Sequence, residues 1–185
     1  RNNSYYYKYW KVSNHMSTLS VDTIQGQTVA ANVKLPQGSI VQTVEFNRRG
    51  QLAVSMSSLA VITSNSYVDI MSKAIVTKFA NSKIYIQFNC ILYESAGNPM
   101  RLTTKILRNS TEINGDQYGG YMATGQMQNY NVSMLDSPSV AAGTTLTYKM
   151  QAAEVGNGTV GVGYGDSGGG SNASIILMEI AQWVL

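Results

Sequence analysis

The chain has 185 residues, of which 12% are charged and 44% are hydrophobic, and its formal net charge is +3. This length suits a single β-rich domain, and the charged fraction is about half of the roughly 25% that is typical of soluble domains. The basic residues are scattered, which argues against nucleic-acid binding. No run of about 18 apolar residues is present that would insert into a membrane.

Residues 1–37 are predicted to form an N-terminal arm that contains the first strands, near 19–24 and 28–34. Within this arm, aromatic side chains stand close together at Tyr5, Tyr6, Tyr7, Tyr9 and Trp10. An apolar cluster at the start of a chain favours docking onto a preceding domain or a neighbouring protein over binding of a soluble ligand.

Residues 38–185 are predicted to form the main domain. Its strands are expected near 39–47, 51–62, 67–79, 83–93, 100–108, 130–135, 144–154, 159–164 and 173–181, from apolar alternation and apolar runs. Turn residues such as Pro36-Gln37-Gly38 and Asn81-Ser82 separate them, and no useful stretch has helical periodicity. The polar, glycine-rich region 110–129 is expected to be an ordered surface loop. This pattern predicts an all-β fold, either a β-sandwich or a jelly roll.

The last fifty residues show the pattern most clearly. Leu146, Tyr148, Met150 and Ala152 alternate with polar residues, which is typical of a half-buried strand. The segment Gly156–Gly170 holds eight glycines in fifteen residues and is predicted to be a loop. Residues 173–181 are apolar on both faces, which predicts a central strand.

No group of residues is suited to catalysis. Gly165-Asp166-Ser167-Gly168-Gly169 matches the loop around the nucleophile of chymotrypsin-like proteases, but that serine needs a histidine base. The only histidine is His15, which lacks the sequence context of a protease histidine and has no second ligand for a metal. The only cysteine, Cys90, alternates with apolar residues and is predicted to be a small buried hydrophobe. We therefore expect a protein that is not an enzyme and needs no cofactor or metal.

The acidic residues are expected to have structural roles. Asp116 and Asp166 lie in glycine-rich segments, where aspartates that cap their own turns are favoured over calcium ligands. Glu179 lies in an apolar strand, so its carboxylate must be paired or solvated. We expect it to meet a Lys or Arg from a neighbouring copy of the chain.

Four tyrosines are the candidate ligand-binding residues, because they lie in or beside the long glycine-rich segments: Tyr118, Tyr121, Tyr130 and Tyr164. Tyrosines on loops offer flat, amphipathic contact area at low entropic cost, which suits sugars and protein surfaces. The alternative, weighed equally, is that they fill the end of the sandwich or a seam between subunits.

Several segments resemble a domain of bacteriophage and cyanophage virion proteins, and they follow in the same order over residues 38–181. They are Gly38-Ser-Ile-Val-Gln-Thr-Val, Ser66-Tyr-Val-Asp-Ile, Ala74-Ile-Val-Thr-Lys-Phe-Ala-Asn-Ser-Lys-Ile-Tyr-Ile, Leu107-Arg-Asn-Ser-Thr-Glu-Ile-Asn-Gly-Asp, Leu135-Asp-Ser-Pro, Thr144-Thr-Leu-Thr-Tyr-Lys-Met-Gln and Ser174-Ile-Ile-Leu-Met-Glu-Ile-Ala. Met71-Ser-Lys and Lys78-Phe depart from the residues usual in this family, which concerns loop shape and not the fold.

The resemblance implies the C-terminal domain of a fibre, spike or similar protein at the surface of a viral particle. It also implies a jelly-roll head of the C1q and tumour-necrosis-factor type, which forms a homotrimer. A physical argument points the same way, because an apolar outer face with few guarding charges is best buried in a closed oligomer. We expect that face to carry Val76, Ile91, Ile175 and Leu177.

The function predicted from the sequence is attachment of a virion to a host-surface polysaccharide or protein receptor. One alternative is a purely architectural protein that decorates a capsid or assembles a tail and contacts other virion proteins. A less favoured alternative is a secreted binding module of the C1q or lectin kind.

Overall fold

The computed structural model describes residues 36–48, 60–62, 66–94, 100–115, 117–123, 125–155, 160–162 and 173–182, all within one compact unit, Lys34–Leu185. The strands are β1 Ile40–Arg48, β2 Ala60–Ile62, β3 Val68–Val76, β4 Lys83–Glu94, β5 Met100–Arg108, β6 Thr111–Glu112, β7 Gln117–Met122, β8 Met127–Asp136, β9 Thr145–Val155, β10 Val160–Val162 and β11 Ala173–Ile180. No described residue is helical, and none of the described segments is a helix that could span a membrane. The predicted all-β fold is confirmed.

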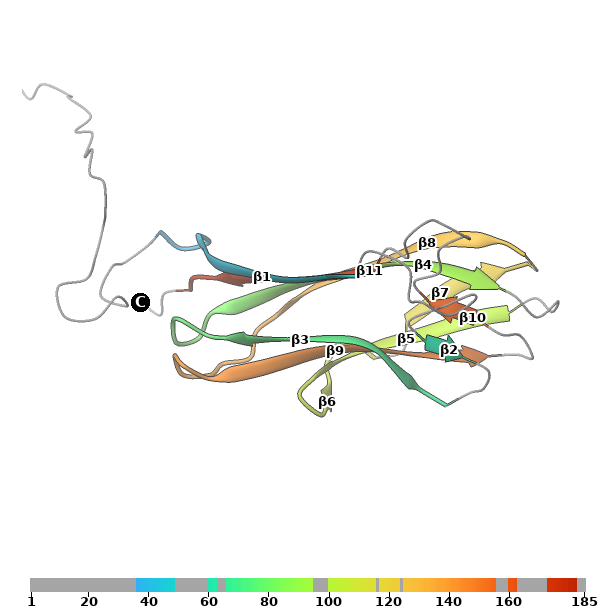
Figure 1. Ribbon diagram of the computed structural model, residues 1–185. Coiled ribbons are helices and arrows are strands. Elements are labelled where there is room, and N and C mark those ends of the chain that lie inside the picture. The colour runs from blue at the N-terminus through green and yellow to red at the C-terminus, as the bar shows by residue number, and fades with distance from the viewer. Residues whose placement is uncertain are drawn as a thin grey trace, which may run out of the picture. The chain divides into compact units, whose positions relative to one another are not determined.

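The strands form two antiparallel sheets that pack face to face (Figure 1). In the large sheet, β11 lies between β1 and β4, β8 pairs with the other edge of β4, and β10 and β2 extend the sheet beyond the end of β11. In the small sheet, β9 lies between β3 and β5, and β6 and β7 pair with β5. Most neighbours are far apart in sequence, as in a jelly roll.

The core lies between the sheets and is built by strict alternation. From β4, Ile84, Ile86, Phe88, Cys90 and Leu92 point inward and are at most 1% exposed. From β9, the inward residues are Leu146, Tyr148, Met150 and Ala152, as the sequence predicts. Each buried aliphatic side chain of this size contributes about 1.5–3 kcal/mol of transfer free energy. The prediction that 173–181 is a central strand is confirmed by the position of β11 between β1 and β4.

The expected surface loop at 110–129 is wrong for most of its length. It contains β6, β7 and the start of β8, joined by turns at positive-φ residues such as Asn109 and Gly125. The Asn114 side chain accepts a hydrogen bond from the Ile106 amide at 2.6 Å and holds β6 against β5. Strand β7 could not be predicted from the sequence, because its pairing with β5 is made by backbone groups, which need no apolar alternation.

The chain enters and leaves the sandwich at the same end, which we call the terminal end. There the Gly38 amide donates to the Ala181 carbonyl at 3.0 Å, and the Ala181 amide donates to the Ser39 carbonyl at 2.9 Å. The β3–β4 and β8–β9 turns lie there too, joined by the Asn81 amide and the Val140 carbonyl at 2.9 Å. At the opposite end, the far end, β4 and β9 finish (Figure 1), and β11 begins four residues before the end of β4.

Candidate functional site

Of the candidate ligand-binding tyrosines, Tyr121 is the one found on the surface in the described residues. It lies on β7 opposite Arg101, close to the far end, and is 63% exposed. Tyr118 is on the same strand, opposite Thr103, but its side chain lies outside the described part of the chain. Tyr164 also lies outside the described residues, as do Tyr5, Tyr6, Tyr7, Tyr9 and Trp10.

Tyr130 does not belong to an exposed ligand surface, so this part of the prediction is wrong. Its register partner on β4 is Cys90, which places it on the inward side of β8, where it is 7% exposed. The Tyr130 hydroxyl shares a hydrogen bond with the Thr104 hydroxyl, and burial raises the pKa of the phenol. Tyr130 instead fits the alternative prediction, in which a tyrosine fills the sandwich.

The outer face of the large sheet is almost free of charge, and we call it the neutral face. Its side chains, on β1, β11, β4 and β8, are Thr43, Asn47, Ser174, Ile176, Met178, Tyr85, Gln87, Asn89, Ile91, Asn129, Asn131, Ser133 and Leu135. Charges occur at its margins, at Glu45 on the edge strand and at Lys83 beside the terminal end. Apolar side chains gather toward the terminal end, where Leu135 is 49% exposed. A face of this kind lacks the charges that keep sheets apart.

The residues predicted for this face are only partly right. Ile91 lies on it, but Ile175 and Leu177 are completely buried and point into the core. Val76 is 45% exposed but belongs to β3, in the small sheet. Because β11 is apolar on both sides, its sequence does not show which set faces inward. The outward residues are Ile176 and Met178.

The outer face of the small sheet carries charged side chains in pairs. Asp69 on β3 accepts hydrogen bonds from Lys149 Nζ and Gln151 Nε2 on β9, each at 2.7 Å. These bonds, led by that from Lys149, hold the pKa of the Asp69 carboxyl below its usual value. On β5, Lys105 Nζ lies 3.4 Å from Glu112 and 4.0 Å from the centre of the Tyr67 ring.

Glu179 is fully buried and is bound by its own chain, which corrects the expected partner from a neighbouring copy. Its carboxylate accepts hydrogen bonds from the Lys78 amide at 2.9 Å and the Phe79 amide at 3.0 Å. The Ser82 hydroxyl at 2.7 Å and Gln42 Nε2 at 2.6 Å complete the set. The carboxylate thus joins β11 to β1 and to the β3–β4 turn, and it needs no basic partner.

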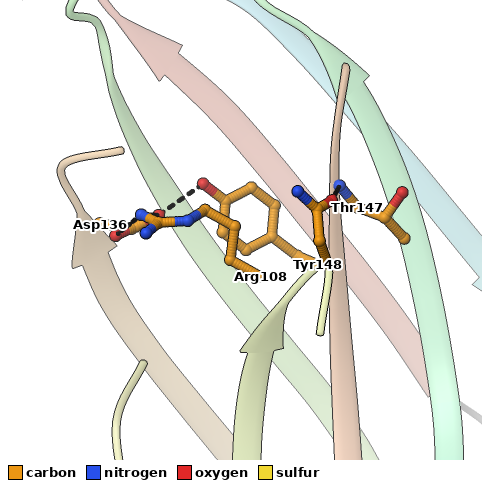
Figure 2. A network of polar contacts seen from close by, with 5 residues as sticks. Arg108, Asp136, Thr147 and Tyr148 are labelled. Atoms are coloured by element: carbon orange, nitrogen blue, oxygen red, sulfur yellow. Dashed lines mark hydrogen bonds and ion pairs between the residues drawn. The ribbon is translucent and has the colours of Figure 1, made fainter. Parts of the chain in front are cut away.

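A second buried carboxylate, Asp136, lies at the terminal end between the sheets (Figure 2). Both of its oxygens accept from Arg108 Nη1 at 2.9 Å, and Oδ2 also accepts from the Tyr148 hydroxyl at 2.7 Å. Burial, reinforced by the bond to Asp136, raises the pKa of the Tyr148 phenol. No sequence motif marks this group, because its members come from the three strands β5, β8 and β9.

Glu179 and Asp136 are therefore held by structural hydrogen bonds. Burial raises the pKa of the Cys90 thiol to about 12, so it is protonated at neutral pH and is a poor nucleophile. In the described residues, no three His, Cys, Asp or Glu side chains gather as a metal-binding group. Ser167, the protease-like serine, and His15 lie outside them.

The fold defines the chain as a jelly-roll β-sandwich with two outer faces of different chemistry. No protein-family model and no curated protein matches the chain. Among solved structures, it is similar to a chain of the T13 particle of infectious bursal disease virus, with 9% identity over 77% of this chain and a TM-score of 0.41. The chain spans 36% to 39% of the length of four such viral chains.

Two further solved structures cover most of their own length. Eiger TNF from S. frugiperda shows 8% identity and a TM-score of 0.41, over 77% of this chain and 95% of that chain. The sugar-binding EclA C-terminal domain shows 13% identity and a TM-score of 0.34, over 83% of this chain and 89% of that chain. The functions stated in these names are those of the matched proteins.

Proposed function

We propose that the chain is a non-enzymatic structural protein of a bacteriophage particle whose jelly-roll domain attaches the particle to a host-surface polysaccharide or protein. The observation that carries the proposal is that the sandwich has two different ends. The chain enters at Gly38 and leaves at Ala181, side by side at the terminal end. The exposed Tyr121 and both flanks of the glycine-rich segment 156–172 lie toward the far end. A domain that is attached to a particle at its terminal end would expose its far end to the host surface.

The resemblance to virion proteins over residues 38–181 supports this location on a particle. It also supports assembly as a homotrimer, and the neutral face offers the surface for contact between copies. Burying it removes exposed apolar groups such as Leu135 from water while leaving the paired charges of the small sheet solvated. Three copies carry three equivalent attachment sites, which raises avidity without tight single contacts.

An architectural role in contact with other virion proteins has one observation in its favour. The exposed apolar residues Ile40, Val76 and Leu135, which are 45% to 57% exposed, all lie toward the terminal end. They lie on three strands of the two sheets, and exposed apolar side chains at one end of a domain are suited to contacts with other proteins. Contacts at the terminal end would bind the domain to the rest of a particle, and they are compatible with host attachment through the far end.

The test compares two truncations of exposed side chains in the purified protein. Tyr121→Ala at the far end should lower binding to a panel of bacterial cells about tenfold, because one exposed aromatic anchor contributes on the order of 1.4 kcal/mol. Val76→Ala, at the terminal end and away from the proposed attachment site, should leave cell binding within about twofold of the unchanged chain. A twofold change corresponds to less than about 0.5 kcal/mol. Equal binding by all three proteins, or binding by none of them, would contradict attachment through the far end.

A further inference from the structure

The paired charges on the outer face of the small sheet form one group, which we call the polar cluster: Tyr67, Asp69, Lys105, Glu112, Lys149 and Gln151. Asp69, Gln151 and Lys105 occupy one row across β3, β9 and β5, because Asp69 is the register partner of Gln151 and Gln151 that of Lys105. Glu112 joins from β6, and Tyr67 directly precedes β3. We propose that the polar cluster is a binding subsite for a neutral, hydroxyl-rich saccharide.

Stability alone does not explain the polar cluster. Only 12% of the chain is charged, yet four charged side chains gather on this patch. Exposed ion pairs contribute about 0–1 kcal/mol each to folding. The carboxylates are open to solvent, with 55% of the Asp69 side chain and 41% of the Glu112 side chain exposed. A ligand can therefore reach the acceptors as well as the donors.

The pairing of charges in the polar cluster favours a ligand without net charge. Each ammonium group already has a carboxylate within 3.4 Å, so the polar cluster has no net charge. An acidic ligand would have to displace Asp69 or Glu112 from a lysine, and a basic ligand would have to displace a lysine from a carboxylate. A neutral ligand breaks neither pair, which avoids leaving a desolvated charge without a partner.

The donors and acceptors of the polar cluster match those of a sugar. Carboxylate oxygens accept, ammonium groups donate, and the Gln151 amide does both, whereas a sugar hydroxyl donates and accepts at once. Asp69 holds the Lys149 and Gln151 side chains by two bonds of 2.7 Å, on strands that belong to the sheet. The groups are thus ordered before a ligand arrives, which lowers the entropic cost of binding. The Tyr67 ring lies 4.0 Å from Lys105 Nζ and helps to hold that ammonium group in place.

The inference rests on the proposed attachment function and gives it a site separate from Tyr121. The experiment uses the full chain and a panel of neutral hexose and N-acetylhexosamine oligosaccharides, with sialylated and sulfated oligosaccharides beside them. Gln151→Ala removes the central amide without changing any charge, and Gln128→Ala removes an exposed amide from the large sheet as the matched control. Thermal unfolding of each variant shows whether the fold is kept.

A neutral oligosaccharide should bind, and Gln151→Ala should weaken that binding about tenfold, the effect of losing roughly 1.4 kcal/mol. Gln128→Ala should leave it unchanged. The proposal is overturned if no neutral oligosaccharide binds, if both variants bind like the unchanged chain, or if only acidic ones bind with an affinity that falls with salt. If Gln151→Ala keeps its binding to cells and Tyr121→Ala loses it, the attachment function stands and this subsite does not. If no form binds cells, the attachment function itself fails.

Discussion

The two outer faces of this sandwich come from the same kind of strand and differ in what they do with charge. The inward sides of both sheets are mostly apolar, but the neutral face has amides, hydroxyls and apolar groups where the small sheet has Asp69, Lys105 and Lys149 in pairs. The scarcity of charged side chains is thus most marked on the neutral face, while the small sheet carries paired charges. A sheet surface without charges is open to association, and one with solvated pairs resists it.

In the proposed trimer, the neutral face would contact copies of the same chain, because amide and apolar side chains can meet there without burying a charge. The small sheet would then face solvent and the proposed ligand. Predictions that move charge between the faces, or remove the groups that hold the sheets, test this division directly.

The largest effect is expected from a charge placed on the neutral face. Gln87→Arg on β4 should convert a trimer to monomers, because each copy would bury an unpaired guanidinium near its neighbours. Thr145→Arg on β9, at an exposed position of the small sheet, should leave the trimer intact. Native mass spectrometry at low micromolar concentration measures both. A trimer that survives Gln87→Arg, or a monomeric unchanged chain, would contradict the assignment of the neutral face.

The next effect comes from the carboxylate that holds the large sheet to the β3–β4 turn. Glu179→Ala should lower the free energy of unfolding by about 3 kcal/mol, because two amides, a hydroxyl and a side-chain amide lose their acceptor in the interior. Glu45→Ala, an exposed carboxylate on the same sheet, should change it by no more than about 0.5 kcal/mol. Urea unfolding compares the two, and similar losses would show that Glu179 is not the anchor described here.

The smallest effect is expected from the exposed pair on the small sheet. Folding lowers the pKa of Asp69, so its contribution to stability is present above the unfolded-state value of about 3.9 and is lost as pH falls through the folded-state value. Asp69→Asn should therefore destabilise by no more than about 0.5 kcal/mol at neutral pH, since solvent screens the pair. The difference should disappear near pH 2. A difference that persists there in urea unfolding would mean that the carboxylate charge is not its source.

The strands could be predicted because alternation records burial directly, and Leu146, Tyr148, Met150 and Ala152 illustrate this on β9. Strand β7 could not, since an edge strand with Gly119 and Gly120 carries no such signal. Tyr130 was misplaced for a related reason. Its neighbours in sequence are polar, and only pairing with β4 turns its ring inward beside Cys90.

By itself, the sequence determined the fold class, the positions of most strands and the scarcity of charge, because alternation, turn residues and composition are local or additive properties. The tertiary structure alone decided which side of β11 faces the core and which groups satisfy Glu179 and Asp136. It also decided that the paired charges meet on one sheet while the other is left neutral. These outcomes depend on registers between strands far apart in the chain, such as β1 with β11 and β3 with β9, and no short segment contains that information.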